Sequence, residues 1–232
     1  MNLPSRIAMA ASLPRRNPEK VAIQLPELLR GLEERFPGEW DEVLAPGEED
    51  GGDWSGLLGR LDHAFDMAVA VQEGLWPDRL RFCLASVTAP GRAGKELDQT
   101  ARERALRGLR HAGGAASWFA LDLAGRSKAE QSLAEAVARL HGAVTADWTP
   151  ARAAAVATYR IAGRQTSVAE KLGITQQAVS QMLLGARFRD LAAAEESLRA
   201  WLKGPDRPGL WPLGAGPQRS QSRLPVVPGL EE

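Results

Sequence analysis

A run of uncharged polar residues carries the clearest chemistry in this sequence. On a helix that begins after Thr175, these residues share one outward face: Gln176, Gln177, Ser180 and Gln181. A glutamine side chain bonds adenine at two points in the major groove of DNA, and a serine hydroxyl bonds several bases. The N-terminal end of such a helix is the part that reaches base edges. We therefore predict that these residues and Thr175 contact duplex DNA.

Basic residues surround this polar run. Lys171, Arg187 and Arg189 lie close to it in the sequence, and such side chains bind phosphates without reading the base sequence. The whole chain is neutral, with 29 basic and 29 acidic residues, but the stretch from Thr149 to Lys203 holds eight basic residues against four acidic ones. Its net charge of +4 leaves −4 on the rest of the chain, an asymmetry that suits a DNA-binding module beside a partner domain.

The positions around the polar run predict two short helices that cross at a tight turn. A helix-turn-helix needs a small residue inside its first helix, here Ala169, and a residue that tolerates positive φ at the turn, here Gly173. Thr175 suits the cap of the second helix, accepting from the backbone of Gln177 or Ala178. The remaining inward positions are apolar: Val168, Leu172, Ile174, Val179 and Met182. Residues 165–184 therefore predict a helix-turn-helix.

Two alternatives to DNA binding stay open at this stage. The same residues fit a plain helical hairpin with a polar surface, and some helix-turn-helix modules bind proteins. The helix that follows, Asp190–Leu202, carries an apolar stripe. We interpret the stripe as packing against the preceding helices, or otherwise as the seam of a homodimer. A dimer would matter, because one module of this size makes only a few base contacts.

The first half of the chain alternates between strand and helix patterns. Pro18 is tolerated at a helix start, Asn17 can cap that helix, and Pro26 should kink it or displace its start. Strands are predicted at Ser5–Ala11, Trp40–Ala45, Leu80–Val87 and Ala116–Leu123, and helices at Asn17–Phe36, Trp54–Leu75 and Asp98–His111. This order predicts an α/β sandwich of helices packed on a sheet.

From Lys128 onward the chain looks entirely helical, so the predicted class is α+β. We expect an N-terminal α/β domain at residues 1–126, an all-α helix-turn-helix domain at 127–203 and a flexible tail at 204–232. Of the 29 tail residues, 11 are Gly or Pro, which leaves few groups to form a core. Gly209–Leu213 and Leu224–Leu230 are the pieces of the tail that would dock on a surface.

Residues for other chemistry are sparse. Cys83 is the only cysteine, which excludes an intramolecular disulfide and a thiolate zinc cluster, and its apolar surroundings predict a core residue. His63, His111 and His141 lack metal-ligand spacing. We therefore expect no catalytic residues, no metal and no cofactor. The sequence shows no signal-peptide pattern and no membrane-spanning stretch, so we expect a cytoplasmic protein that does not bind membranes.

Taken together, these patterns resemble the SatD family of small bacterial proteins, from about Arg6 to Leu202. The resemblance is carried by Asp147-Trp148-Thr149 ahead of QTSVAEKLGITQQAVSQML, and by the strand Arg79–Phe82 after Leu75-Trp76-Pro77. It implies an N-terminal domain with a ferredoxin-like or cyclase-palm-like sheet, followed by a helix-turn-helix. It also implies a transcription regulator whose N-terminal domain serves dimerisation or signal input.

The chain departs from the family where a palm-type site would hold its carboxylates. Ala10-Ala11-Ser12 replaces the family's Gly-Asp pair, and Gly51–Gly56 keeps only Asp53 of its acidic signature. A later acidic segment is represented only by Asp98–Ala101. Palm-type phosphoryl chemistry needs two carboxylates around Mg²⁺, so the protein is not expected to be an enzyme. Glu48, Glu49 and Asp50 are interpreted as a solvated acidic turn.

Three hypotheses therefore remain. The first is a sequence-specific DNA-binding regulator whose partner is double-stranded DNA, with a homodimer as its assembly. The second is a nucleotide-binding or cyclase-like enzyme with a degenerate palm site. The third is an adaptor that binds another protein through its helix-turn-helix and its tail.

Overall fold

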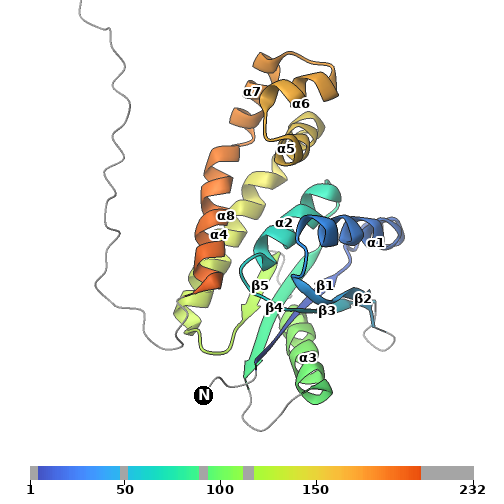
Figure 1. Ribbon diagram of the computed structural model, residues 1–232, viewed down its shortest axis with the longest axis vertical. Helices are drawn as coiled ribbons and strands as arrows, with labels where there is room; N and C mark the ends of the chain where they lie inside the picture. Colours follow the sequence, from blue (N-terminus) through green and yellow to red (C-terminus); the bar gives the residue numbers. More distant parts are fainter. Residues whose placement is uncertain (1–4, 48–51, 89–93, 112–117, 205–232) are drawn as a thin grey trace, which may run out of the picture.

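A five-stranded mixed sheet with helices on both faces forms one half of the molecule, and helices form the other (Figure 1). This computed structural model describes residues 5–47, 52–88, 94–111 and 118–204. The predicted α+β class is confirmed. The acidic turn at Glu48–Asp50 and the tail segments Gly209–Leu213 and Leu224–Leu230 lie outside the described residues, as does nearly all of the predicted tail.

The elements of the described residues follow in this order. They are β1 (Ser5–Ser12), α1 (Pro18–Arg35), β2 (Trp40–Pro46), β3 (Trp54–Leu58), α2 (Ala64–Gly74), β4 (Arg81–Thr88), α3 (Lys95–His111), β5 (Phe119–Asp122), α4 (Lys128–Ala146), α5 (Pro150–Ala162), α6 (Gln165–Leu172), α7 (Gln176–Gly185) and α8 (Phe188–Lys203). Among them, no helix is both long enough and apolar enough to cross a membrane.

The strands lie in the order β2-β3-β1-β4-β5. β1 is antiparallel to both β3 and β4, and β2 is antiparallel to β3. Strands β1 to β4 with α1 and α2 therefore have the βαββαβ arrangement of ferredoxin-like sheets, as expected. β5 extends the sheet as a parallel neighbour of β4. Helices α4 to α8 follow β5 in the chain and build the other half of the molecule.

The predicted helix at Trp54–Leu75 is wrong over nearly its first half, residues 54–63. Trp54–Leu58 is strand β3, and the helix begins only at Ala64. All five residues of β3 are buried, so the strand lacks the alternation that marks a half-buried strand, and a short apolar run is ambiguous between strand and helix. Gly56 marks the strand, because a Cβ there would lie 2.6 Å from the backbone oxygen of Glu42 on β2.

The central strand β1 divides its side chains between the two faces of the sheet. Met9 and Ala11 face a core formed with α1, α2, α4 and α8, whereas Ala8 and Ala10 face a second core formed with α3. This division follows the period of two along a strand. Cys83 of β4 is fully buried in the second core, and burial raises the pKa of its thiol to about 12, as suits the predicted core residue.

Helix α1 differs from its prediction at the N-terminus. Asn17 lies at the cap position but in the left-handed region, at φ 54°, and its side chain makes no cap hydrogen bond. The side-chain amide of Asn17 instead donates to Oδ1 of Asp78 at 3.3 Å. Pro26 does not displace the start of the helix, which runs from Pro18 to Arg35 with Pro26 inside it.

Side chains from both sides of residue 126, the predicted domain boundary, pack together in one core. Ala134 and Ala138 of α4 belong to the sheet core, as do Leu198 and Leu202 of α8. Leu191, at the start of α8, belongs to a separate cluster around α5, α6 and α7. The apolar stripe of Asp190–Leu202 thus packs within the chain. The domain boundaries and the homodimer stay predictions.

Candidate nucleic-acid interface

The bend between α6 and α7 is set by Gly173. This residue ends α6 in the left-handed region, at φ 65°. The amide of Ile174 donates to the backbone oxygen of Ala169 at 3.0 Å, and the amide of Gly173 donates to that of Glu170 at 3.3 Å. These two bonds form a Schellman motif, which satisfies the last carbonyls of the helix. The chain therefore leaves α6 sharply instead of continuing it.

Thr175 begins α7 as the sequence predicts. Its backbone is extended, and its hydroxyl accepts a hydrogen bond from the amide of Ala178 at 3.1 Å. The cap satisfies one of the free amides at the helix start and so defines where α7 begins. The residues that follow Thr175 therefore have a fixed helical phase.

A small apolar cluster holds α6 and α7 against α5. Val168, Ala169 and Val179 are buried in it, and Leu172 and Ile174 pack against it half-buried. Met182, which was predicted to face inward, is half-buried and lies outside the cluster. Leu183 is buried in the cluster instead. The reason is that Val179 and Leu183 are four positions apart and so face the same side of the helix. Other members include Trp148, whose Nε1 donates to the backbone oxygen of Ala186 at 3.2 Å.

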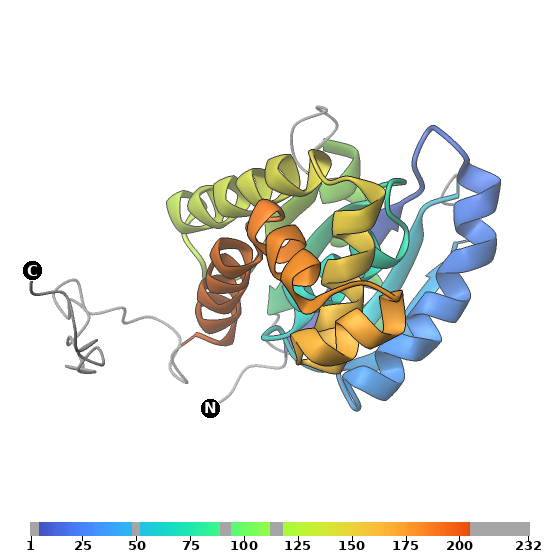
Figure 2. The ribbon, with the colours of Figure 1, turned by 90° about the horizontal axis from the view of Figure 1, so that it is seen from above.

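The opposite side of α7 is exposed. α6 and α7 lie at one end of the molecule, and the view from above shows them on top of α5 (Figures 1 and 2). Every polar residue that the sequence assigns to DNA contact on this helix is exposed: Thr175, Gln176, Gln177, Ser180 and Gln181. No described part of the chain covers this face.

The basic residues of this region separate into two groups. Arg160 and Arg199 form ion pairs with Glu195 and Asp66, so they are not available for phosphate. Lys171, Arg187 and Arg189 are exposed and form no ion pair with any residue that the structure describes. The sequence count of +4 therefore includes two arginines that serve structure, and Lys171, Arg187 and Arg189 are among the cations that form no ion pair in the part of the chain that the structure describes.

A groove beside α7 brings three of the predicted contacts together. Ser180, Arg187 and Arg189 line a cavity of about 480 Å³, with Tyr159 and Phe188 in its wall. The two aromatic rings meet edge to face with centroids 5.2 Å apart. Gln176 and Gln177 do not line the groove. The aromatic wall was not predicted from the sequence, because Tyr159 lies on α5 and reaches Phe188 of α8 only in the folded chain.

Arg187 has an unusual backbone. It lies between α7 and α8 at φ 56° and ψ 32°, in the left-handed region, and its side chain makes no cap hydrogen bond. A residue with a Cβ is strained there by about 1–2 kcal/mol. Strained residues occur often at functional sites, where the surrounding structure holds them in place.

A buried ionic network fixes the helices beneath this surface. Arg160 of α5 bonds Glu73 of α2 and Glu195 of α8, and Glu195 also bonds Nε2 of His141 on α4 at 2.9 Å. Burial alone would raise the pKa of Glu195, but the hydrogen bonds from His141 and Arg160 outweigh it and lower the pKa to about 2. Burial raises the pKa of Glu73 despite Arg160. The network joins α2, α4, α5 and α8.

The ends of β1 and β3, where a palm-type site would hold its two carboxylates, carry a different pair of residues. The last described pair between β1 and β3 is Ala11 with Trp54, so Ser12 and Asp53 lie at the same end of the sheet. Ser12 is buried, and its hydroxyl accepts from Nε of Arg81 at 3.2 Å. A hydroxyl group therefore stands on β1 where the resemblance would require a carboxylate.

Comparisons with known proteins leave the family undetermined. No family model matches the chain. The comparison with curated proteins gives no match either. Among solved structures, a regulator of polyketide synthase expression from Bifidobacterium adolescentis is similar, at 14% sequence identity and a TM-score of 0.32, over 86% of this chain and 81% of that chain. A likeness this distant carries no argument about function.

Proposed function

We propose that this protein binds duplex DNA through the outer face of α7 and regulates transcription. The observation that carries the proposal is the exposed glutamine-rich face of a short helix whose start is capped by Thr175 and whose inner face is packed on α5 and α6. A rigid helix of this kind fits the major groove, which is wide enough for one α-helix.

Each polar residue has a role in this proposal. Gln176 and Gln177, in the first turn of α7, reach base edges and bond adenine at two points. Ser180 and Gln181, one turn later, contact neighbouring bases or the backbone. Thr175 sets the start of the helix and stands beside the phosphates. These contacts give sequence preference, and each good pair discriminates by about 1–3 kcal/mol.

The cations around α7 bind the DNA backbone. Arg187 and Arg189 line the groove beside α7, and Lys171 lies in the last turn of α6. A phosphate in the groove would be bonded by arginines that form no ion pair with any described residue, and it would lie beside the carboxylate of Asp190, which lines the same groove. Phosphate contacts supply affinity for any duplex and make it fall steeply with salt.

The sheet domain serves dimerisation or signal input in this proposal, as the SatD resemblance implies. A single helical pair contacts few base pairs, so a regulator of this size gains specificity from two copies. Two copies related by a two-fold axis would read half-sites about 34–36 Å apart. The cytoplasm is the matching compartment.

The test is selection of bound fragments from a random duplex library, followed by titrations with the selected site. Replacing both Gln176 and Gln177 by Ala should bring the affinity for the selected site close to that for a scrambled duplex. Arg187→Ala should weaken both duplexes alike and reduce the salt dependence by about one phosphate contact.

Matched controls come from exposed residues of the sheet domain. Gln24 and Gln99 are exposed glutamines on α1 and α3, and Arg30 is an exposed arginine on α1. Replacing these residues by Ala should leave DNA binding unchanged. Selection that yields no preferred sequence, or α7 variants that bind as the wild type does, would reject the proposed face.

A second candidate is an adaptor that binds a protein through the same end of the molecule. Two large apolar side chains favour it: Leu184 on α7 is 69% exposed and Ile161 on α5 is 77% exposed. Isolated exposed apolar residues are common on protein surfaces, so this observation is weaker. An adaptor would ignore duplex DNA and co-purify with one partner at a fixed ratio, and Leu184→Ser would release that partner.

A further inference from the structure

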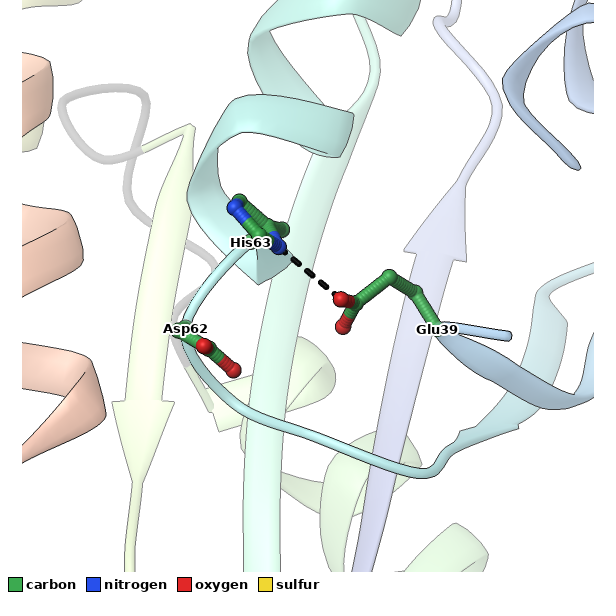
Figure 3. A group of neighbouring side chains, drawn as sticks. All are labelled: Glu39, Asp62 and His63. Carbon is green, nitrogen blue, oxygen red and sulfur yellow. Dashed lines mark hydrogen bonds and ion pairs between the residues drawn. The ribbon is translucent and has the colours of Figure 1, made fainter. Parts of the chain in front are cut away.

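Three side chains that can bind a metal meet at the edge of the sheet domain. Glu39 lies just before β2, and Asp62 and His63 lie just before α2 (Figure 3). One ligand atom of each residue lies within 4.8 Å of the others. The sequence shows no metal-ligand spacing around His63, because Glu39 comes from a different connection and reaches it only in the folded chain.

The Glu39 carboxylate has an unused oxygen. Its Oε1 lies 2.9 Å from Nδ1 of His63, and its Oε2 is buried without a hydrogen-bond partner among the described residues. The side chain is only 8% exposed, and Figure 3 shows it extending toward Asp62 and His63. A buried carboxylate oxygen that is left without a partner costs stability. A cation between these side chains would remove that cost.

Arg60 supplies a positive charge at the same place. Its guanidinium bonds both carboxylate oxygens of Asp62, and its Nε lies 4.0 Å from Oε1 of Glu39. The Arg60 side chain is 59% exposed, so it can turn away into solvent without leaving a cavity.

We propose that Glu39, Asp62 and His63 bind a divalent metal ion of the zinc class, and that Arg60 is the cation the metal displaces. Two carboxylate oxygens and one imidazole nitrogen are ligands that zinc accepts, and three protein ligands leave a fourth position for water. His63 is 34% exposed, so solvent reaches this side of the cluster. Ligand atoms about 2.0–2.2 Å from zinc lie roughly 3.4 Å apart, so the side chains need to shift by about 1 Å.

The chain holds few other imidazole or thiol groups that could compete for zinc in a binding measurement. Its imidazoles and thiol are His63, His111, His141 and Cys83. His141 is 4% exposed within the ionic network and Cys83 is fully buried, so both are withdrawn from solution. His111 is exposed on α3, where its Nδ1 bonds the backbone oxygen of Arg107. It is therefore the matched control for His63.

The experiment is a calorimetric titration of the full chain, free of any affinity tag, with Zn²⁺ and separately with Mg²⁺. The wild type should bind one Zn²⁺ ion reversibly, with Mg²⁺ far weaker because imidazole suits zinc better. Glu39→Gln and His63→Gln should each weaken Zn²⁺ binding by about 100-fold. Glu34→Gln on α1 and His111→Gln should bind as the wild type does.

Arg60→Gln is the variant that separates a metal site from a structural ion cluster. If Arg60 competes with the metal, its removal should tighten Zn²⁺ binding by about tenfold, which partial unfolding cannot do. If Arg60 is a fixed partner of Asp62, its removal leaves the affinity unchanged or lowers it, and the proposal is overturned. Absence of saturable binding in both the wild type and Arg60→Gln also overturns it, as does full binding by both ligand variants.

Discussion

Arg160 donates to both carboxylate oxygens of Glu195, at 2.8 and 2.7 Å, and so joins α5 to α8 inside the molecule. The two side chains are 12% and 4% exposed. Because α5 carries the α6–α7 pair and α8 packs on the sheet core, this ion pair fixes the position of the candidate DNA-binding surface relative to the sheet.

Glu195→Gln should therefore destabilise the protein. The substitution leaves Arg160 buried with Glu73 as its remaining carboxylate, and breaking a buried pair costs about 3–5 kcal/mol. Chemical denaturation at pH 7 measures the loss. Glu196→Gln is the matched control, since Glu196 is exposed on the same helix and should give a change within about 0.5 kcal/mol. Equal stability of the two variants would show that the pair contributes little.

The same residue should govern part of the acid sensitivity. The folded pKa of Glu195, about 2, lies below its ordinary value of 4.5, so its stabilisation is present above pH 4.5 and is lost as the pH falls toward about 2. The raised pKa of Glu73 acts with the opposite sign; its main cause, burial, is present in both proteins, and the smaller contribution from the charge of Glu195 is lost in the variant. The stability difference between wild type and Glu195→Gln should hence shrink over this pH window. A difference that stays constant would contradict the assignment.

A further prediction concerns Gly108 on α3 and the face of the sheet that α3 covers. A Cβ at this position would lie 2.5 Å from Sγ of Cys83 on β4. Gly108→Ala should overpack this contact and cost about 1–3 kcal/mol, although alanine favours a helix. Cys83→Ala removes the sulfur, so the double variant should recover most of that loss. Thermal denaturation of the two single variants and the double variant gives the coupling; additive losses would show that the contact is not the cause.

The elements near α7 were predictable from sequence because their signals are local. Gly173 ends one helix and Thr175 caps the next, and both signals act within a few residues. Strand β3 was missed for the opposite reason, since burial on both faces removes the period that identifies a strand. Met182 was placed inward because spacing alone does not distinguish it from Leu183.

Long-range charge pairing was not predictable. Arg160 is one of the eight basic residues counted in the predicted DNA-binding segment, but Glu73 and Glu195 reach it from α2 and α8. The meeting of Glu39 with Asp62 and His63 likewise depends on how the connection before β2 passes the start of α2. Spacing patterns identify a site only when one element carries its residues.

Substitutions of Thr175 measure how much the cap of α7 contributes to stability and to DNA binding. Thr175→Ala removes the acceptor for the amide of Ala178 and should lower the free energy of unfolding by about 1 kcal/mol. Thr175→Ser keeps the hydroxyl and should retain most of the stability. In DNA titrations the alanine variant should bind more weakly, because the first turn of α7, which holds the glutamines, frays. If alanine and serine behave alike in both measurements, the cap has no role in the interface.

Two substitutions of Arg187 separate its effect on protein stability from its effect on DNA binding. Its backbone at φ 56° suits glycine, so Arg187→Gly should stabilise the protein by about 1 kcal/mol, whereas Arg187→Ala keeps the strain and should leave stability nearly unchanged. Both variants lose the guanidinium that lines the groove with Ser180, so both should weaken DNA binding equally. Arg15→Ala, at an exposed site outside helix and strand, controls for the loss of one charge. A glycine variant that is more stable and still binds DNA as the wild type does would remove Arg187 from the interface and leave its strained backbone without a functional reason.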